Sequence, residues 1–278
     1  MRRRDLLMAG VGAVTLANSS RAEPPADAMC KKILPQTTFV LVHGANHGGW
    51  CWRDVRKQLR EQHHEVFTPT LTGLGDRSHL VSPDIGLQDH VTDITNLILA
   101  EELQDFILVG HSYGGTVVSG VCDLLRDRIR AVVFLDANTP ANGEPTIPGL
   151  TPEVVERVLG QPLQDGYLVP PMDPIRLGIP LDDAENYAWV KRRMTGQPIK
   201  TLSDPLELRN GGTDGMNRTF VLTTRKDQLQ PFALKRLLEI DQDPTWKYQE
   251  LLVGHDAMVI APCAVANLLV ELATGETT

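Results

Sequence analysis

The sequence predicts an α/β fold: a doubly wound, mostly parallel sheet of about six strands with helices on both faces. Short runs of apolar and β-branched residues alternate with longer stretches of helical spacing along most of the chain. The apolar runs are continuous, which is typical of parallel strands buried on both faces. Because crossover connections between such strands are right-handed, the intervening helices are expected on both faces of the sheet.

The predicted strands are short apolar runs, and the predicted core helices are amphipathic stretches between them. The strands are placed at residues 38–42, 66–68, 106–109, 131–135, 220–222 and 250–253. The core helices are placed at residues 52–63, 87–103, 114–125 and 264–273. Strands and helices that alternate in this way indicate βαβ units.

Residues 137–215 interrupt this alternation. The stretch is rich in proline, glycine and charge, and it shows helical spacing only at residues 152–159 and 183–194. It follows the fourth predicted strand, so it is expected to cover the carboxyl edge of the sheet, where open α/β sheets bind ligands. We therefore predict a core of residues 37–136 and 216–278, with residues 137–215 as an inserted cap.

Length and charge limit the classes of function. The chain has 278 residues, which fits one α/β domain with an inserted segment. Its formal net charge is −8 and its basic residues are not clustered, which argues against a nucleic-acid partner. The expected partner is a small molecule, without a membrane span, and the sequence does not predict an oligomeric state.

The first residues have the composition of an export signal. Arg2, Arg3 and Arg4 precede a short apolar stretch, which ends in the small-x-small pattern Ser20-Arg21-Ala22. The paired arginines and the weakly apolar stretch are typical of a twin-arginine signal. Residues 1–22 are therefore predicted to be a signal peptide of a bacterial protein that is exported to the periplasm or secreted.

No cofactor or metal is expected from the sequence motifs. The four cysteines match no disulfide framework and no Cys-x-x-Cys zinc pattern, so free buried thiols are favoured. His43 and His47 lie in a glycine-rich turn without an evident third ligand, and they are interpreted as loop-structuring residues. The loop at residues 73–75 lacks the third glycine of a dinucleotide fingerprint.

Ser112 is the candidate nucleophile. It lies in Gly110-His111-Ser112-Tyr113-Gly114, a G-x-S-x-G pattern directly after a predicted strand and directly before a predicted helix. A sharp strand-to-helix turn leaves room only for small residues beside the serine, and it exposes the hydroxyl above the sheet. The strand–turn–helix context therefore indicates nucleophilic catalysis by Ser112.

A serine hydroxyl needs a base, and the base needs an acid to orient it. His255 is the only histidine that follows Ser112 in the chain, and it comes just after the last predicted strand. Asp227, after the strand at residues 220–222, is the favoured acid, and Asp136, at the end of the preceding strand, is the alternative. Asp256 is discounted because it is adjacent to His255 and would have to fold back.

Two backbone amides are expected to bind the oxyanion that forms when a carbonyl is attacked. Tyr113 follows the nucleophile and supplies the first amide, and Ala45, in the loop after the first strand, supplies the second. Trp189 lies on the predicted helix at residues 183–194 of the cap. Packing beneath the cap is the commoner role of such a residue, and we assign Trp189 as a substrate-binding candidate.

From about residue 37 to its end, the chain resembles the α/β-hydrolase family. The nearest members are bacterial pyrethroid-hydrolysing carboxylesterases, plant salicylate-binding methylesterases and hydroxynitrile lyases. The resemblance rests on residues 39–45, 47–50, 110–115 and 254–256, and on residues 71–80 and 188–193, which look most like the bacterial esterases. It implies that Asp227 matches the family's acid position and that the first two strands of the fold are absent.

The resemblance implies a serine carboxylic ester hydrolase that acts through an acyl-enzyme on small to medium hydrophobic or aromatic esters. The related lyases have a threonine where this chain has Gly44, and a lysine where it has Asp256. An aspartate there would repel the departing cyanide, so the esterase is preferred. The alternatives are a hydroxynitrile lyase and a ligand-binding receptor on a hydrolase scaffold. Only a measurement of turnover distinguishes the receptor from an enzyme.

Overall fold

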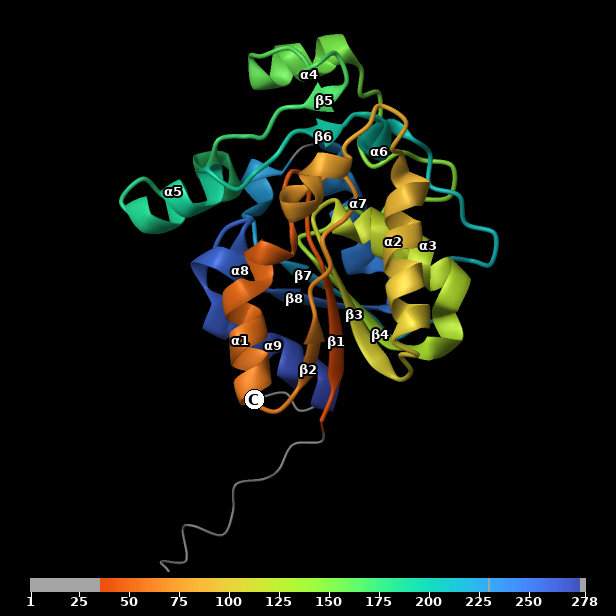
Figure 1. Ribbon diagram of the computed structural model, residues 1–278. Helices are drawn as coiled ribbons and strands as arrows, with labels where there is room; N and C mark the ends of the chain where they lie inside the picture. Colours follow the sequence, from red (N-terminus) through yellow and green to blue (C-terminus); the bar gives the residue numbers. More distant parts are fainter. Residues whose placement is uncertain (1–35, 230, 276–278) are drawn as a thin grey trace, which may run out of the picture. The chain divides into compact units, whose positions relative to one another are not determined.

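The computed structural model describes residues 36–229 and 231–275, which are drawn in colour in Figure 1. The predicted signal peptide, residues 1–22, lies outside the described residues. Among the described cysteines, Cys51 and Cys122 are buried free thiols and Cys263 is an exposed one. None of the helices in these ranges is long and apolar enough to cross a membrane.

Six strands form one sheet in which every neighbouring pair is parallel, and this confirms the predicted fold class. The strands are β1 (Thr38–Val42), β2 (Glu65–Phe67), β3 (Phe106–His111), β4 (Ile129–Leu135), β7 (Arg218–Leu222) and β8 (Trp246–Glu250). Their order in the sheet is β2-β1-β3-β4-β7-β8. The order reverses between β1 and β3, so the loops that follow these two strands flank the crevice where open sheets bind ligands.

Helices cover both faces of the sheet (Figure 1). The core helices are α1 (Arg53–Glu61), α2 (Leu87–Ala100), α3 (Gly114–Leu125), α7 (Pro231–Gln242), α8 (Ala257–Ile260) and α9 (Pro262–Thr274). On one face α1 packs against α9, and on the other α2 packs against α3. Val91, Val117 and Leu237, from α2, α3 and α7, share one apolar cluster, which places α7 on the face of α2 and α3.

Between β4 and β7 the chain forms short elements that lie beyond the carboxyl ends of the strands in Figure 1. They are α4 (Pro152–Leu159), β5 (Leu168–Val169), η5 (Pro174–Leu177), α5 (Ala184–Lys191), β6 (Gln197–Pro198) and α6 (Lys200–Ser203). β5 and β6 pair antiparallel, apart from the main sheet. The helices predicted at residues 152–159 and 183–194 correspond to α4 and α5.

Two elements near the end of the chain differ from the prediction. The last strand, β8, lies at Trp246–Glu250 and not at residues 250–253. As an edge strand it is only partly buried, so its sequence Trp-Lys-Tyr-Gln-Glu lacks the apolar run expected of a central strand. The apolar residues 251–253 belong instead to the loop that leads to His255. The sequence interpretation also missed α7, which buries Leu237 and Ile240.

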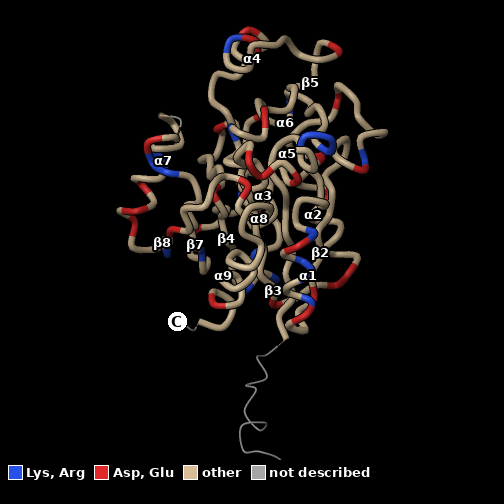
Figure 2. Tube along the Cα trace, turned by 90° about the vertical axis from the view of Figure 1, so that its left-hand side faces the viewer, with Lys and Arg blue, Asp and Glu red and all other residues tan. Residues whose placement is uncertain are grey.

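Acidic and basic residues are interspersed over the described elements in the view of Figure 2. α7 and β8 lie side by side there, as their contacts also indicate. On α7, Glu239 pairs with Lys235 and with Arg236, so charges of both signs offset each other on this helix.

Candidate active site

The loops that follow β1, β3, β4 and β8 converge at the carboxyl edge of the sheet. Ser112 follows β3 in the left-handed backbone region, with φ of 51°. A side chain at Gly110 would bring its Cβ within 2.7 Å of the Gly114 carbonyl oxygen, and one at Gly114 within 2.8 Å of the His43 carbonyl oxygen. The tight turn therefore requires small residues on both sides, as the G-x-S-x-G pattern predicts.

His255 lies against Ser112, as predicted. Its Nε2 is 2.9 Å from Ser112 Oγ, the distance of a hydrogen bond that the hydroxyl donates. The loop that carries it is held on both sides: the Gly254 amide donates to the Thr223 carbonyl, and His111 Nε2 donates to the His255 carbonyl at 2.9 Å. The imidazole is thus fixed in reach of the hydroxyl proton.

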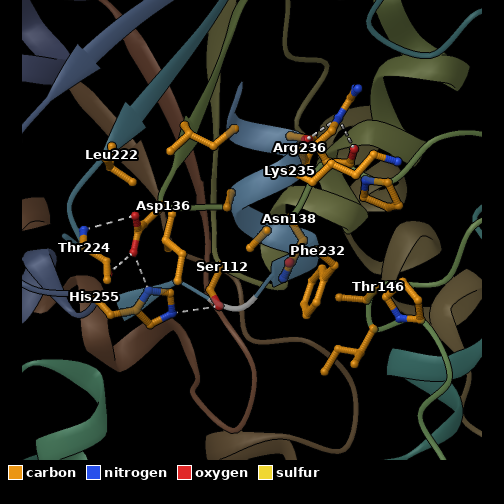
Figure 3. A pocket seen from close by; sticks show the side chains of 18 of the residues that line it. Ser112, Asp136, Asn138, Thr146, Leu222, Thr224, Phe232, Lys235, Arg236 and His255 are labelled. Atoms are coloured by element: carbon orange, nitrogen blue, oxygen red, sulfur yellow. Dashed lines mark hydrogen bonds and ion pairs between the residues drawn. The ribbon is translucent and has the colours of Figure 1, made fainter. Parts of the chain in front are cut away.

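Asp136, which follows β4, is the carboxylate that contacts His255 (Figure 3). His255 Nδ1 lies 2.6 Å from Asp136 Oδ2. Asp136 Oδ1 accepts the amides of Thr223 at 3.0 Å and Thr224 at 3.2 Å, and the Thr224 hydroxyl donates to Oδ2. The side chain is only 2% exposed, so these donors replace water around the carboxylate.

The electrostatics of this pair favour an ionised carboxylate. Burial alone would raise the pKa of Asp136, but the hydrogen bond and charge of His255, with the Thr224 and Thr223 donors, hold it well below its usual range. Burial alone would lower the pKa of His255, but the hydrogen bond and charge of Asp136 raise it above its ordinary value of 6.5. An ionised Asp136 accepts the proton on Nδ1, which leaves Nε2 as the acceptor facing Ser112.

The prediction that Asp227 is the acid is wrong in this structure. Asp227 lies on η6 (Lys226–Gln228), with its side chain 65% exposed, and both of its carboxylate oxygens accept from the Arg225 guanidinium. Its pKa is lowered by that hydrogen bond with Arg225, and not by an imidazole. The open alternative, Asp136, occupies the position beside His255.

Ala45 and Tyr113, the predicted oxyanion-binding residues, lie in two turns that adjoin Ser112. Tyr113 directly follows Ser112 and precedes α3, whereas Ala45 follows Gly44 in the loop after β1. Gly44 is packed against Ser112, since a Cβ at Gly44 would lie 2.9 Å from Ser112 Cβ. Within the described residues, neither of these two amides donates a hydrogen bond to another protein group.

Asn46, a residue that the sequence interpretation did not assign, connects the Ala45 loop to residues 169–197. Its amide donates to Gln197 Oε1 at 2.8 Å, and its side chain donates to the carbonyls of Val169 and Thr195. Its φ of 62° is tolerated by asparagine better than by most residues. The loop is thereby anchored to the segment predicted as a cap, a contact between distant positions that no local pattern signals.

His43 and His47 structure the loop after β1, as interpreted. His43 Nδ1 donates to the Gly44 carbonyl at 2.8 Å, and His43 Nε2 accepts the Leu71 amide at 3.1 Å. Burial lowers the pKa of His43 to about 3, so this imidazole is neutral. His47 donates to the Ala45 carbonyl. In the described part of the chain, no cluster of His, Cys, Asp and Glu is arranged to hold a metal ion.

Trp189 does not line the cavity at Ser112, contrary to the prediction that it binds substrate. The guanidinium groups of Arg53 and Arg193 lie 4.5 Å and 4.9 Å from its ring centroid, and the ring is edge-on to Trp50. Each guanidinium gains cation–π attraction to the indole. Trp189 therefore packs α5 onto the core, which is the structural role weighed for it.

A cavity of about 560 Å³ opens at Ser112 and His255. Figure 3 shows Asn138, Thr146 and Phe232 around it. Its apolar lining includes Ile147, Met172, Leu177, Leu222, Leu229 and Phe232, and its polar and charged lining includes Glu144, Arg176, Gln228, Lys235, Arg236 and Glu239. Lys235 and Arg236 both pair with Glu239. The cavity at Ser112 therefore combines apolar surface with polar and charged groups.

The family model described as "Alpha/beta hydrolase family" matches residues 39–268. A "Carbendazim hydrolyzing esterase" of Nocardioides sp. (strain SG-4G) is 39% identical over 245 residues, which cover 84% of this chain and 98% of the relative. "Methylesterase 7" of Arabidopsis thaliana is 31% identical over 137 residues, which cover 46% of this chain and 53% of the relative.

Two solved structures share the fold. An extracellular alpha/beta-hydrolase from Paenibacillus species, described as similar to Tobacco Salicylic Acid Binding Protein 2, gives a TM-score of 0.69 at 24% identity, covering 85% of this chain and 98% of that one. A pyrethroid hydrolase from Sphingobium faniae JZ-2 gives 0.62 at 22% identity, covering 85% and 97%. The resemblance to α/β-hydrolases stated from the sequence is confirmed.

Proposed function

Because the chain belongs to the alpha/beta hydrolase family, we propose that it is a serine carboxylesterase with Ser112 as its nucleophile. The observation that carries the proposal is the unbroken hydrogen-bonded series from Ser112 through His255 to Asp136. A hydroxyl, an imidazole and a buried carboxylate in this order can activate the serine and store the proton it loses.

The proposed reaction has two displacements. His255 Nε2 accepts the Ser112 proton while Oγ attacks the ester carbonyl, and the imidazolium that forms is stabilised by Asp136. His255 then donates that proton to the departing alcohol, which leaves an acyl group on Ser112. Water then attacks the acyl carbonyl while His255 accepts its proton, and His255 returns that proton to Ser112 Oγ as the acid leaves. No cofactor takes part in these steps.

The amides of Ala45 and Tyr113 are proposed to bind the oxyanion during both displacements. Tyr113 is held in place by its side chain, since its hydroxyl lies 2.8 Å from His90 Nδ1 while His90 Nε2 donates to the Thr72 carbonyl. Donors that are fixed before the reaction cost no reorganisation when charge develops on the carbonyl oxygen.

The substrate class follows from the cavity walls. Their apolar side chains and the volume of about 560 Å³ suit small to medium hydrophobic or aromatic esters. The names of two relatives, a carbendazim-hydrolysing esterase and a methylesterase, point to the same class of small substrate. We therefore propose carbendazim and aromatic methyl esters as the first compounds to test.

A hydroxynitrile lyase is the alternative enzyme, and two observations disfavour it. A threonine Cβ at Gly44 would lie 2.8 Å from His111 Nδ1 and 2.9 Å from Ser112 Cβ, so those side chains would have to shift. Where the lyases resembling this chain have a lysine, Asp256 is fully buried and hydrogen-bonded to His47. The side chain at this position therefore supplies no positive charge of its own to a departing cyanide.

Turnover by wild type and Ser112→Ala, measured in parallel, tests the proposal. The panel contains short-chain p-nitrophenyl esters, an aromatic methyl ester, a pyrethroid-type ester, carbendazim and mandelonitrile. We expect hydrolysis by wild type that the variant loses while it keeps its circular dichroism spectrum. Cyanide release from mandelonitrile would instead support the lyase. A folded wild-type protein that turns over nothing would support the binding role.

We also propose that residues 1–22 direct export to the periplasm or beyond the cell. The motif Arg2-Arg3 is the feature that supports it, and one structural relative is described as extracellular. Cell fractionation of wild type and an Arg2→Lys/Arg3→Lys variant tests this proposal. Wild type that remains in the cytoplasm would contradict it, whereas we expect export that the paired substitution abolishes.

A further inference from the structure

A second histidine–aspartate pair lies next to the catalytic one. His47 Nε2 is 3.1 Å from Asp256 Oδ2, and the two side chains are 2% and 0% exposed. His47 belongs to the loop after β1 that contains Ala45, whereas Asp256 directly follows His255. The pair therefore joins the loop of a proposed oxyanion donor to the segment of the proposed base.

The hydrogen-bond partners of His47 determine its protonation. Its Nδ1 lies 2.7 Å from the Ala45 carbonyl oxygen, which can only accept a hydrogen bond. Its Nε2 faces Asp256, whose carboxylate also only accepts when ionised. Both ring nitrogens must then carry protons, which makes His47 an imidazolium and the contact an ion pair. A neutral pair would require a proton on Asp256 instead.

The surroundings favour the ionised pair. Burial by itself lowers the pKa of His47, but the charge and hydrogen bond of Asp256 and the Ala45 carbonyl raise it above the ordinary value. Burial by itself raises the pKa of Asp256, but the charge and hydrogen bond of His47 lower it. Four other groups face the pair electrostatically: His111 and His43, which are neutral, His255, and the Cys51 thiol, whose pKa burial raises.

The negative charge of the buried Asp256 is stabilised mainly by His47. Among the described residues, Asp256 Oδ1 is buried without a hydrogen-bond partner, so His47 supplies the only side-chain donor to the carboxylate. A buried carboxylate that loses its counter-charge pays a large desolvation cost. The main chain of Asp256 is held separately, because its amide donates to the Leu177 carbonyl at 2.9 Å.

We propose that His47 and Asp256 are positioning residues whose buried ion pair fixes the Ala45 loop relative to His255. The proposal rests on the proposed esterase function, in which the Ala45 amide binds the oxyanion. The imidazolium donates to the carbonyl of Ala45 and so sets the orientation of that turn, while Trp50 stacks on a face of the ring with centroids 5.1 Å apart. Neither His47 nor Asp256 is among the described residues that line the cavity at Ser112.

Kinetics of His47→Gln, Asp256→Asn and the double variant test the positioning role. Loss of one oxyanion donor costs about 10²-fold to 10³-fold in kcat, so a misplaced donor is expected to cost about 10-fold to 100-fold. The loss is expected in kcat with KM little changed, because the donor acts on the transition state. The double variant should lose less than the product of the two single losses, since both break one interaction.

His64→Gln is the matched control, because it removes another buried histidine at the opposite end of the strands. The buried His64 accepts a hydrogen bond from the Thr37 amide. It lies just before β2, at the amino ends of the strands, whereas Ser112 follows the carboxyl end of β3. We expect it to leave kcat unchanged. Titration of Ser112 with a fluorophosphonate to its end point gives the fraction of folded sites. Unchanged kcat per titrated site in both single variants would overturn the proposal.

Nitrogen NMR of the wild-type imidazoles separates this proposal from the esterase assignment, since it needs no turnover. We expect one histidine that keeps protons on both ring nitrogens at neutral pH, where exposed histidines have lost one, and whose signals disappear in His47→Gln. A His47 with one protonated nitrogen at neutral pH would overturn the ion pair even in an active enzyme. If the His47 ring is doubly protonated but the protein has no esterase activity, the ion pair is supported and only the proposed esterase function is refuted.

Discussion

The loops after β4 and β7 each carry an aspartate at the same edge of the sheet, yet their carboxylates have opposite surroundings. Asp136 after β4 is 2% exposed at its side chain and accepts hydrogen bonds from His255, Thr223 and Thr224. Asp227 after β7 is 65% exposed and pairs with the neighbouring Arg225. The β7 loop thus contributes donors to the site, and the β4 loop contributes the charge.

This difference separates an acid that can orient a base from one that cannot. A buried carboxylate surrounded by fixed donors keeps its charge at low dielectric and interacts strongly with an imidazolium. An exposed carboxylate beside an arginine is screened by water and salt, and its charge is already balanced. Proximity to a strand end is therefore insufficient; the burial of the carboxylate and its donors decide the role.

Replacement of Asp136 should produce the largest effect. Asp136→Asn keeps the shape but removes the charge that holds the proton on His255 Nδ1, so kcat is expected to fall about 10³-fold to 10⁴-fold. Steady-state hydrolysis of a p-nitrophenyl ester measures it. Full activity in Asp136→Asn, together with a loss in Asp227→Asn, would return the acid role to Asp227.

The pH profile should reveal the same pair. Activity requires neutral His255, so kcat/KM is expected to rise with pH through the pKa of this residue. In wild type that pKa lies above 6.5, because Asp136 stabilises the imidazolium more than burial destabilises it. In Asp136→Asn, His255 stays buried but loses the charge that stabilised its imidazolium, so its pKa should fall. The rise in kcat/KM should therefore occur at lower pH. A rise that stays in place, or moves to higher pH, would contradict the assignment.

A smaller effect is expected from Thr224→Val. The variant removes the hydroxyl that donates to Asp136 Oδ2 but keeps the Thr224 amide that donates to Oδ1. A hydrogen bond to a charged group contributes about 1.5–3 kcal/mol, and part of this is lost in catalysis, so kcat/KM should fall about 10-fold or less. Thr224→Ser, which restores the hydroxyl, should recover most of the activity, and its failure to do so would assign the loss to packing.

The smallest effects are expected at the exposed pair. Asp227→Asn and Arg225→Ala remove a contact that solvent already screens, so neither kcat/KM nor Tm should change measurably. Differential scanning calorimetry and the same ester assay check this. A clear loss of activity in Asp227→Asn at unchanged Tm would show that the exposed loop rearranges to reach His255.

Sequence patterns predicted the parts of the fold in which the local pattern of apolar residues matches the burial that the folded chain gives them. The continuous apolar runs of β1, β3 and β4 are buried on both faces, and the glycines at residues 110 and 114 follow directly from the tight turn. The edge strand β8 was misplaced because one-sided burial leaves no apolar run. Its partner helix α7 was missed along with it.

In the site, sequence alone identified the proposed nucleophile and the proposed base, which the structure brings into hydrogen-bond contact. Ser112 is marked by the residues that its turn requires, and His255 is the only histidine that follows it. The acid could not be determined in this way, because Asp136 and Asp227 both follow strands at one edge. Only the folded chain decides which carboxylate is buried, and also that Trp189 contacts two arginines and that His47 meets Asp256. These contacts join residues distant in the chain, and their energies depend on burial and on partners that no local pattern contains.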